Sequence, residues 1–500
     1  MAGAVSALAT LAVAHLVAAF LDPGASPLGA LGDAFIDLTP SWLKDAAIAA
    51  FGVNDKAALL VGMVVVIAVL AAATGVLAHR APLAGTGVVL ALGGVSAIAA
   101  TSRADATALA AVPSLVGAAV GAVCLAILVR RLGRTGFGGA PPAAADRRSF
   151  LQLAAGLAAV AVLAAAAGSV AGSVRRTAAA ARDLLTLPRP ARAAPAVSAG
   201  AQSPVAGVVD VVTANEDFYR IDTAFVVPQV DPKTWTLRVH GLVEREVTMT
   251  FDELLDTSLV EAWVTLTCVS NPIGGDLAGN AKWLGLPVRE VLAMARPLPA
   301  ADMVLSRSAD GFTASTPLPV LTDDRDALLA VGMNGEPLPL EHGFPVRMVV
   351  PGLYGYVSAT KWLVDLEVTR FADQQAYWTQ RGWSELGPVK TASRIEVPRA
   401  GARVAAGTVA VGGTAWAQHT GITAIEVQVD DGPWEAATLA DEISADTWRQ
   451  WSWQWAATAG EHTLRVRASD PVDGPQTGEQ AGVLPDGATG WHEVAVTVTD

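Results

Sequence analysis

The 500-residue chain is long enough for roughly two to four domains, and 52% of its residues are hydrophobic while only 16% carry charge. Its mean hydropathy of +0.41 is high for a purely soluble protein, so part of the chain is expected in lipid. The formal charge of −13 argues against a nucleic-acid partner. The two cysteines, Cys124 and Cys268, are too few for a disulfide framework or for a cysteine-rich zinc or iron–sulfur site.

Hydrophobic stretches close to the length that crosses a membrane, about 20 residues, dominate residues 1–175. Any one of them alone would also fit a buried core helix. Five together, with almost no charge inside them, predict an N-terminal α-helical transmembrane bundle of about five spans, with membrane lipid as its partner. The predicted spans are Ala4–Leu21, Ala57–Ala78, Leu83–Ala100, Leu109–Val129 and Phe150–Val174.

Basic residues predict the orientation of these spans, because cytoplasmic loops are enriched in Lys and Arg. Arg80 follows the second span, and five arginines lie between residues 130 and 148, ahead of the fifth. We therefore expect a multi-pass protein of the cytoplasmic membrane with its soluble half on the extracytoplasmic (periplasmic or outer) side. The acidic loop Asp22–Asp55 would lie on that side too, with Ser41–Phe51 as an interfacial helix.

The fifth span begins with Asp146-Arg147-Arg148-Ser149-Phe150-Leu151-Gln152-Leu153. This run resembles a twin-arginine export signal, here internal and extending over residues 146–174. That pathway exports proteins already folded in the cytoplasm, often around a cofactor. An ordinary positive-inside flank would also place arginines here. No small-residue cleavage site stands out, so we expect the span to remain as an anchor, followed by an Ala-, Arg- and Pro-rich linker over residues 176–205.

Two histidines, His15 and His79, are the candidates for axial haem ligands in the membrane half. A b-type haem usually needs two histidines at matching depth. His15 lies mid-span and His79 at a cytoplasmic end, so we predict that no haem is bound. Cys124, inside the fourth span, is expected to be a small packing residue.

The soluble half has two parts with different patterns. Residues 206–385 show a mixed α+β pattern, and residues 386–500 alternate apolar and polar side chains as β-strands do. In the first part we expect strands at Trp235–His240, Glu261–Thr267, Val346–Val350 and Trp362–Val368 and a short helix at Phe251–Leu255. In the second part we expect strands at Ile425–Val429, Leu464–Ala468 and Val494–Val498, with a turn at Asp430–Gly432.

Residue types alone leave the chemistry of Cys268 open. A thiolate at the end of a strand is a soft metal ligand or a nucleophile, and His342, Arg347 and Lys361 are donors suited to a phosphate or an oxidised heterocycle. Cys268 could equally be an inert buried residue. It could also be the nucleophile of a cysteine hydrolase, with His342 or His240 as its base.

A series of motifs narrows these alternatives. Met333-Asn334-Gly335-Glu336 is followed by His342-Gly-Phe-Pro-Val-Arg347, then by Val-Val-Pro-Gly352, and finally by Gly355 and Lys361-Trp362-Leu363. In this order, and over roughly residues 210–500, the motifs resemble the sulfite oxidase family. In that family one cysteine sulfur binds molybdenum beside the pterin dithiolene and oxo groups. The resemblance therefore implies a molybdopterin-dependent oxidoreductase with a molybdenum–molybdopterin cofactor, and Cys268 as its metal ligand and catalytic residue.

The same resemblance implies which residues hold the pterin. His342 and Arg347 would contact its phosphate region, with Lys361 nearby. The other cofactor-binding residues that it implies are Asn215, Phe218, Tyr219 and Arg220 of an N-terminal cofactor loop, then Ser308, Ser358 and Thr360.

The chain departs from the family at places where positive charge normally holds sulfite. The family typically continues its cysteine motif with Gly-Asn-Arg-Arg, but here Asn271 is followed by Pro272 and Ile273. Val331 replaces a tyrosine, and Gly355-Tyr356-Val357 replaces Gly-Ala-Arg. Periplasmic methionine-sulfoxide reductases of the same superfamily also lack those arginines. A sulfoxide or similar oxide is therefore expected ahead of sulfite, and the alternatives are a sulfite dehydrogenase or a non-catalytic membrane receptor or scaffold.

The remaining expectations concern partners. Since no haem or iron–sulfur motif is present, electrons are expected to pass to or from a quinone or a redox protein, beside the small-molecule oxide or sulfur substrate. Residues 386–500 predict an all-β immunoglobulin-like sandwich. It resembles the C-terminal domain that pairs sulfite oxidase subunits, so a homodimer is also a candidate arrangement.

Overall fold

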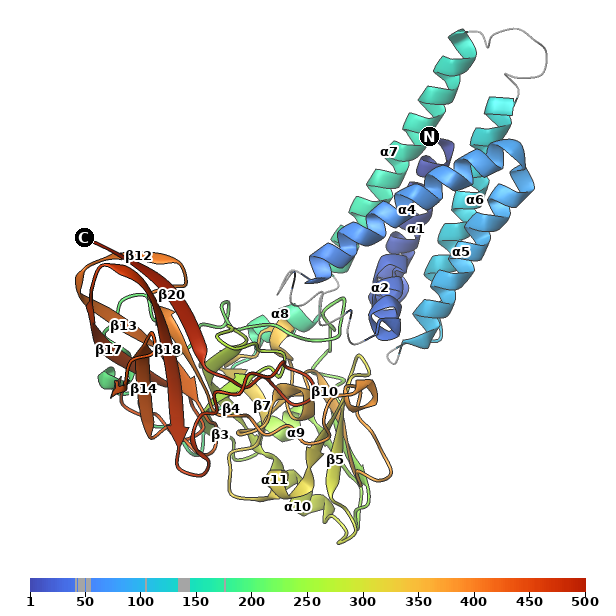
Figure 1. Cartoon of the computed structure of the whole chain (residues 1–500). Coiled ribbons are helices and arrows are strands. Elements are labelled where there is room, and N and C mark those ends of the chain that lie inside the picture. The colour runs from blue at the N-terminus through green and yellow to red at the C-terminus, as the bar shows by residue number, and fades with distance from the viewer. Residues whose placement is uncertain (41–42, 44–49, 51–54, 104–105, 134–143, 175–176) are drawn as a thin grey trace. The chain divides into compact units, whose positions relative to one another are not determined.

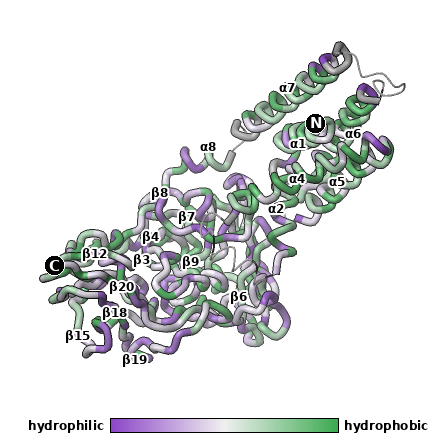
Figure 2. The backbone as a smooth tube through the Cα atoms, turned by 45° about the horizontal axis from the view of Figure 1, so that its top comes forward, coloured by the Kyte–Doolittle hydropathy of each residue, from purple (hydrophilic) through white to green (hydrophobic). Residues whose placement is uncertain are grey.

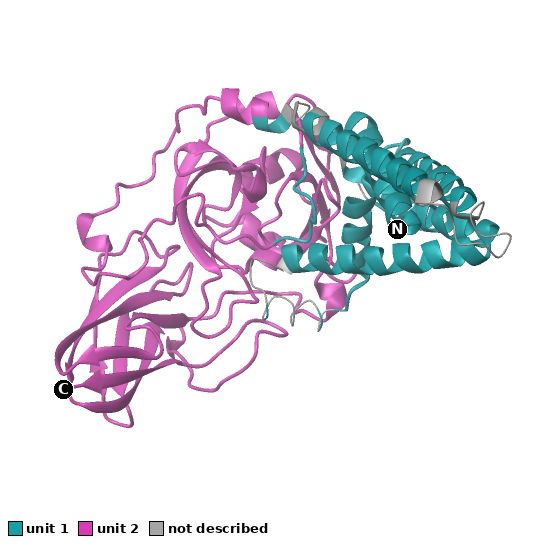
Figure 3. Ribbon diagram, turned by 90° about the horizontal axis from the view of Figure 1, so that it is seen from above, with its two compact units in different colours: residues 1–179, 222–229 teal, residues 180–221, 230–500 magenta. Residues whose placement is uncertain are grey.

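The computed structural model describes residues 1–500 apart from 41–42, 44–49, 51–54, 104–105, 134–143 and 175–176. The described residues divide into two compact units (Figures 1 and 3). Unit 1 comprises Met1–Ala179 and Asp222–Gln229, and unit 2 comprises Ala180–Ile221 and Val230–Asp500. The predicted interfacial helix at Ser41–Phe51 lies outside the described residues, except for Leu43 and Ala50.

Unit 1 is helical and strongly apolar, as the hydropathy colouring of Figure 2 shows. Five of its helices are long and apolar enough to cross a membrane, in agreement with the five predicted spans. The helices of unit 1 among the described residues are α1 Ala2–Leu21, η1 Pro23–Ala25, α2 Pro27–Leu38, α4 Asp55–Arg80, α5 Pro82–Ser102, α6 Val112–Gly133 and α7 Ala144–Val174, followed by α8 Thr177–Leu184 at the boundary with unit 2.

The fourth predicted span starts too early. We expected it from Leu109, but α6 begins at Val112, because residues 108–111 form turns and Pro113 sits in the first helical turn, where its missing N–H costs nothing. The arginine motif Asp146–Leu153 lies in the first turns of α7. Its role as an export signal stays a prediction.

Small and polar residues hold the helices of unit 1 together. Ser6 Oγ of α1 donates a hydrogen bond to the Gly121 carbonyl of α6 at 2.8 Å. His15 Nε2 of α1 lies 3.3 Å from Ser169 Oγ of α7. Close packing of small side chains and interhelical hydrogen bonds are the interactions that remain available between helices in lipid, where the hydrophobic effect offers none.

The first part of unit 2 is an α+β domain with two sheets. One sheet has the strand order β2-β1-β10-β5-β6, and the other has the order β3-β4-β7-β8 with β9 paired to β7. Their strands are β1 Thr236–Gly241, β2 Val247–Thr250, β3 Val260–Thr267, β4 Ala278–Pro287, β5 Met303–Ser308, β6 Thr313–Pro317, β7 Leu328–Met333, β8 Glu336–Pro337, β9 Arg347–Val349 and β10 Leu363–Thr369. The helices are α9 Phe251–Leu255, α10 Val288–Ala295 and α11 Leu318–Thr322.

Local sequence accounts for several of these elements. The expected helix Phe251–Leu255 is confirmed as α9, and a capping box between Thr250 and Glu253 satisfies its first N–H groups. Strand β4 is buried along almost its whole length, because it lies between β3 and β7. The apolar core of this domain is shared by both sheets and the helices between them.

The C-terminal part of unit 2 consists of two further sheets that enclose one apolar core. Their orders are β11-β13-β17-β16 and β12-β20-β18-β14-β15, with β19 paired to β18. The strands are β11 Ala392–Val397, β12 Ala402–Ala405, β13 Gly407–Trp416, β14 Ala424–Val429, β15 Trp434–Ala436, β16 Thr438–Leu439, β17 Arg449–Ala457, β18 Gly460–Asp470, β19 Gly474–Pro475 and β20 His492–Thr499. The expected turn at Asp430–Gly432 joins β14 to β15. That the sandwich is immunoglobulin-like stays a prediction.

The residues predicted as a linker run along unit 2 for most of their length. Ala191 N donates to Leu259 O at 2.7 Å, and Glu261 N donates to Arg192 O at 2.8 Å. Further on, Ser203 N donates to Gln450 Oε1 at 2.6 Å. The segment is therefore fixed by backbone hydrogen bonds that an Ala- and Pro-rich composition does not reveal.

Candidate molybdenum cofactor site

Cys268 lies directly after β3, in a tight loop that returns to β4. Its N–H donates to Leu277 O at 2.9 Å, and its carbonyl accepts from Asn271 N at 3.1 Å. The Asn271 side chain is buried and closes the loop from inside, because its Oδ1 accepts from Leu277 N at 2.9 Å. The thiol of Cys268 is half-buried and forms no disulfide. A thiol held on a short, braced loop at the end of a sheet strand is well placed to act as a fixed metal ligand.

The C-terminal sandwich forms hydrogen bonds with β3, the strand that ends directly before Cys268. Gln418 follows β13, and its Nε2 donates to Thr267 Oγ1 at 2.7 Å and to Thr265 O at 3.1 Å. Thr265 N donates in turn to Asp446 O at 3.0 Å, and Trp448 N donates to Thr265 Oγ1 at 2.8 Å. Two segments of the sandwich, one at Gln418 and one at Asp446–Trp448, thus fix the C-terminal end of β3. None of these contacts was predicted from the sequence.

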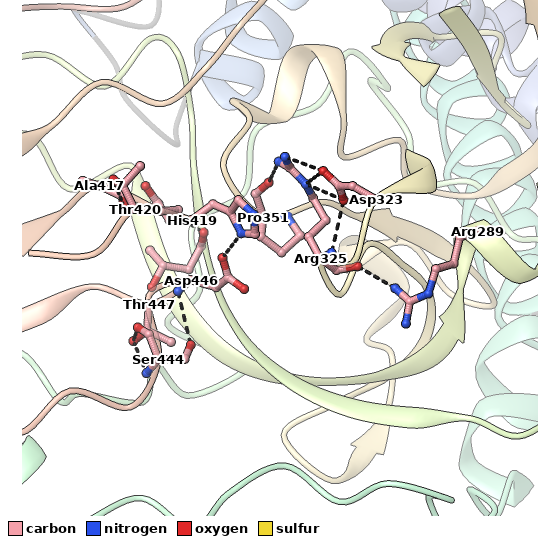
Figure 4. A network of polar contacts seen from close by, with 12 residues as sticks. Arg289, Asp323, Arg325, Pro351, Ala417, His419, Thr420, Ser444, Asp446 and Thr447 are labelled. Carbon is pink, nitrogen blue, oxygen red and sulfur yellow. Dashed lines mark hydrogen bonds and ion pairs between the residues drawn. The ribbon is translucent and has the colours of Figure 1, made fainter. Parts of the chain in front are cut away.

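A polar network around the same sandwich segment reaches a second loop near the site (Figure 4). His419 Nδ1 lies 3.0 Å from Asp446 Oδ1, and this hydrogen bond raises the pKa of His419. Arg325 is bonded to Asp323, and its Nη1 donates to Pro351 O at 2.9 Å. Pro351 begins the loop of residues 351–361, which ends at Lys361. The residues of Figure 4 therefore hold this loop and the Asp446 segment in place.

The second half of the candidate site is built around His342. Its Nε2 lies 3.1 Å from the Asn215 carbonyl, which can only accept, so Nε2 carries the proton. Burial lowers the pKa of His342 to about 3, and the charges of Lys361, Arg347 and Arg220 add to this effect. The ring is therefore neutral at physiological pH, and Nδ1 is a hydrogen-bond acceptor. In the described part of the chain this buried Nδ1 has no partner.

Two cations that the sequence singled out converge on this histidine. Arg347 is buried, and its Nη1 donates to His342 O at 3.1 Å. Lys361 is also buried, and its Nζ donates to Glu341 O at 3.0 Å. Gly343 makes the approach possible: its φ is +112°, and a side chain there would lie 3.0 Å from Arg347 Cβ and 3.1 Å from Lys361 Cβ.

Aromatic rings from the N-terminal cofactor loop line the same region. Phe218 packs edge-on against the His342 ring at a centroid distance of 5.5 Å and against Trp283 at 5.7 Å. Tyr219 stacks on Phe218 at 5.3 Å. Burial raises the pKa of Tyr219, the charge of Cys268 raises it further, and that of Arg347 lowers it. Tyr219 therefore lies within electrostatic range of both the thiol and the cationic group.

Asn215 is held in place by the Met-Asn-Gly motif. Asn334 Nδ2 donates to Asn215 Oδ1 and to Thr213 O, both at 2.9 Å, and Asn334 Oδ1 accepts from Lys282 N at 2.9 Å. Asn334 has a φ of +53°, a conformation that Asn tolerates better than most residues. The motif thus acts on the cofactor loop through hydrogen bonds that brace it.

The three predicted hydroxyl residues are buried but bonded within the protein. Ser358 Oγ donates to Tyr354 O at 2.9 Å, and Thr360 Oγ1 lies 2.7 Å from Ser306 Oγ. Ser308 Oγ accepts from Asp310 N at 3.4 Å in the turn after β5. These bonds give the hydroxyl groups a structural role in shaping their loops, and the cofactor contacts implied for them stay predictions.

The positions that depart from the family are now placed. Val331 is fully buried in β7, and Val357 is fully buried in the core of the α+β domain. Tyr356 is also buried, and its hydroxyl donates to Ser384 O at 2.9 Å. Pro272 is exposed and Ile273 half-buried in the loop after Cys268. The two positions beside the cysteine are therefore apolar and accessible.

Comparison with known proteins gives the family. A family described as the oxidoreductase molybdopterin binding domain matches residues 224–378. An uncharacterized oxidoreductase of Bacillus subtilis (strain 168), YuiH, is 32% identical over 165 residues, which cover 78% of that protein and 32% of this chain. Mitochondrial sulfite oxidase of Homo sapiens is 29% identical over 328 residues. The chain belongs to the sulfite oxidase family of molybdopterin oxidoreductases.

The family likeness does not extend over whole proteins. The match to human sulfite oxidase covers 55% of this chain and 59% of that protein. Among solved structures, the sulfane dehydrogenase SoxCD from Paracoccus pantotrophus aligns with a TM-score of 0.48 and 22% identity, over 55% of this chain and 79% of that one. The molybdopterin-domain match includes Cys268, His342, Arg347 and Lys361. It starts after the cofactor loop at Asn215–Arg220.

The residues of the site fit a molybdopterin. The unpartnered Nδ1 of His342 is a buried acceptor for an N–H group, and Arg347 and Lys361 supply the positive charge that a phosphate needs. Cys268 supplies a soft sulfur ligand. The roles of individual residues stay predictions, but the structure brings His342, Arg347, Lys361, Asn215 and Phe218 together as the resemblance implied.

Proposed function

We propose that the chain is a membrane-anchored molybdenum-cofactor oxidoreductase that acts outside the cytoplasmic membrane and transfers an oxygen atom to or from a small substrate. The observation that carries the proposal is the neutral, buried His342 with an open Nδ1 acceptor among three cationic side chains. A protein that kept the fold as a receptor only would have no reason to keep a buried cationic group, which is costly without an anion.

The bound cofactor would supply the two-electron oxygen-transfer chemistry, and the chain would supply its position and surroundings. Cys268 would hold the metal from the braced loop after β3. Arg347, Lys361 and Arg220 would balance the phosphate, while His342 accepts a hydrogen bond from the pterin side. Tyr219, within electrostatic range of both the thiol and Arg347, would offer a hydroxyl donor to the reacting centre.

The substrate is proposed to be a sulfoxide or a similar neutral oxide. Pro272 and Ile273 give the accessible loop beside Cys268 an apolar surface, which does not attract an anion. Sulfite is the second candidate, because the first relatives found are named sulfite oxidases and because Arg220 brings a positive charge near His342. We further propose a quinone or a redox protein as the electron partner, lipid around unit 1, and a homodimer as a candidate assembly.

The deciding experiment measures molybdenum and pterin per chain in protein from a host that makes the cofactor, followed by turnover with sulfoxides, N-oxides and sulfite. About one metal per chain and turnover of a neutral oxide in preference to sulfite are expected. Cys268→Ala should abolish turnover, whereas Cys124→Ala serves as the matched control and should leave it intact. A metal-free, folded wild-type protein, or full activity of Cys268→Ala, would refute the proposal.

A further inference from the structure

The chain enters unit 1 for eight residues directly after the candidate cofactor loop. Asp222–Gln229, which we call the strap, belongs to unit 1, although Ile221 and Val230 on either side belong to unit 2 (Figure 3). A single residue, Ile221, separates Arg220, the last residue of the cofactor loop, from the strap. Whatever holds the strap therefore also limits the freedom of the loop.

Polar contacts between described residues hold the strap within unit 1. Lys56, at the start of α4, forms an ion pair with Asp222, and the Asp222 side chain is only 6% exposed. Asp33 of α2 accepts a hydrogen bond from Phe225 N at 2.9 Å. A nearly buried carboxylate needs its partner, because removal of one member of such a pair leaves an uncompensated charge.

The shape of α2 matches the strap as well. A side chain at Gly32 would lie 2.7 Å from the Phe225 ring, so only glycine lets this ring lie against the helix. One turn earlier, a side chain at Gly29 would lie 3.5 Å from Val226. The strap is thus seated by an ion pair, a backbone hydrogen bond and an aromatic contact on neighbouring elements of unit 1.

The other end of the cofactor loop is fixed inside unit 2. The Asn215 carbonyl bonds to His342, and its side chain bonds to Asn334. A short loop that is tethered at both ends can adopt fewer conformations than a free loop. It therefore loses less conformational entropy when a ligand orders it.

We propose that unit 1 is more than an anchor: Lys56 and Asp33 are positioning residues that hold the strap and, through the continuous chain, restrict the motion of the adjoining cofactor loop Asn215–Arg220. This inference rests on the proposed function, because it takes Asn215–Arg220 to be a cofactor loop. It assigns the membrane unit a part in cofactor retention.

The test uses the full chain, loaded with cofactor in its host and held in detergent micelles or nanodiscs. Pterin release after dilution is followed over time by the fluorescence of the oxidised pterin. Lys56→Ala and Asp33→Leu should each release pterin about tenfold faster than the wild type, as expected for a broken, largely buried contact. The charge exchange of Lys56→Asp with Asp222→Lys should restore most of the wild-type rate. Amide hydrogen exchange at Phe218–Arg220 should rise in the single variants and fall again in the exchange variant.

Asp22→Asn is the matched control. It weakens the contacts of Asp22 with Arg103 and Thr107 inside unit 1, neither of which is a strap residue, and should leave release unchanged. If Asp22→Asn speeds release as much as Lys56→Ala, the effect reflects general loosening of unit 1 and the inference fails. It also fails if both strap variants release pterin at the wild-type rate, in which case bound pterin leaves the proposed function standing. A wild-type protein that holds no pterin would overturn both.

Discussion

The low pKa of His342 makes a prediction about acid stability. The folded chain keeps this ring neutral down to about pH 3, whereas an unfolded chain protonates it near 6.5. Below pH 6.5 the unfolded state therefore binds more protons than the folded one. The stabilisation of the folded chain that comes from this neutral ring is fully present above pH 6.5 and is lost as the pH falls from 6.5 toward 3.

The magnitude follows from the two pKa values. At 1.36 kcal/mol per pKa unit, the complete loss below pH 3 is on the order of 5 kcal/mol. Between pH 7.5 and pH 5 the same relation gives about 2 kcal/mol for this one ring. His419 and His462, whose pKa values are raised by Asp446 and Asp430, act in the opposite direction. A comparison with His342→Gln therefore isolates the share of His342, since Gln offers a similar donor and acceptor.

Denaturant unfolding of the cofactor-free chain, followed by tryptophan fluorescence, measures this quantity. All but one of the 14 tryptophans lie beyond residue 205, so the signal reports unit 2. The wild type should lose about 2 kcal/mol more than His342→Gln between pH 7.5 and pH 5. Equal losses in the two proteins would show that His342 is not held neutral by its surroundings, and the fit argued for the cofactor would lose its main support.

Three further predictions follow from the site. Arg347→Ala should lower pterin affinity by about 10- to 100-fold, because it removes charged hydrogen-bond donors from a buried position; unchanged pterin content would contradict the phosphate role. Gln418→Leu should lower kcat about tenfold at normal molybdenum content and shift the Mo(V) electron paramagnetic resonance signal, since β3 loses two hydrogen bonds beside Cys268; a wild-type spectrum would argue against positioning. Asn334→Gly keeps the positive φ but loses three side-chain hydrogen bonds, and should cost about 1–3 kcal/mol of unfolding free energy; a value near zero would exclude the bracing role.

The sequence predicted those parts of the site that are recorded in local motifs. Cys268 at a strand end, and His342, Arg347 and Lys361 around Gly343, were singled out by their residue types, and the family resemblance of the surrounding motifs joined them into one site. The cofactor loop at Asn215 could be predicted only through the family resemblance. Hydropathy likewise located the five long apolar helices of unit 1, because a helix long enough to cross a membrane needs about 20 consecutive, mostly apolar residues.

What the sequence did not reveal depends on contacts between distant segments. Gln418 lies about 150 residues from Thr267, in a loop with no periodicity or motif that points toward Cys268. The strap reads as an ordinary part of the soluble half, and only its contacts with Lys56 and Asp33 show its attachment to unit 1. Such long-range pairings are set by tertiary packing, which single-residue propensities do not encode.

The hydrogen bonds between the sandwich and β3 have a consequence for biosynthesis. Thr265 reaches its final hydrogen bonds only when Gln418, Asp446 and Trp448 have been made. At about 5–20 residues per second, the ribosome needs roughly 10–40 s to advance from Cys268 to Trp448. During that interval the loop of Cys268, the proposed metal ligand, lacks these hydrogen bonds and is exposed on an incomplete fold. Under the proposed function, metal loading at Cys268 would therefore wait for the last hundred residues, and a nascent chain stalled before Trp448 should acquire neither metal nor a stable catalytic domain.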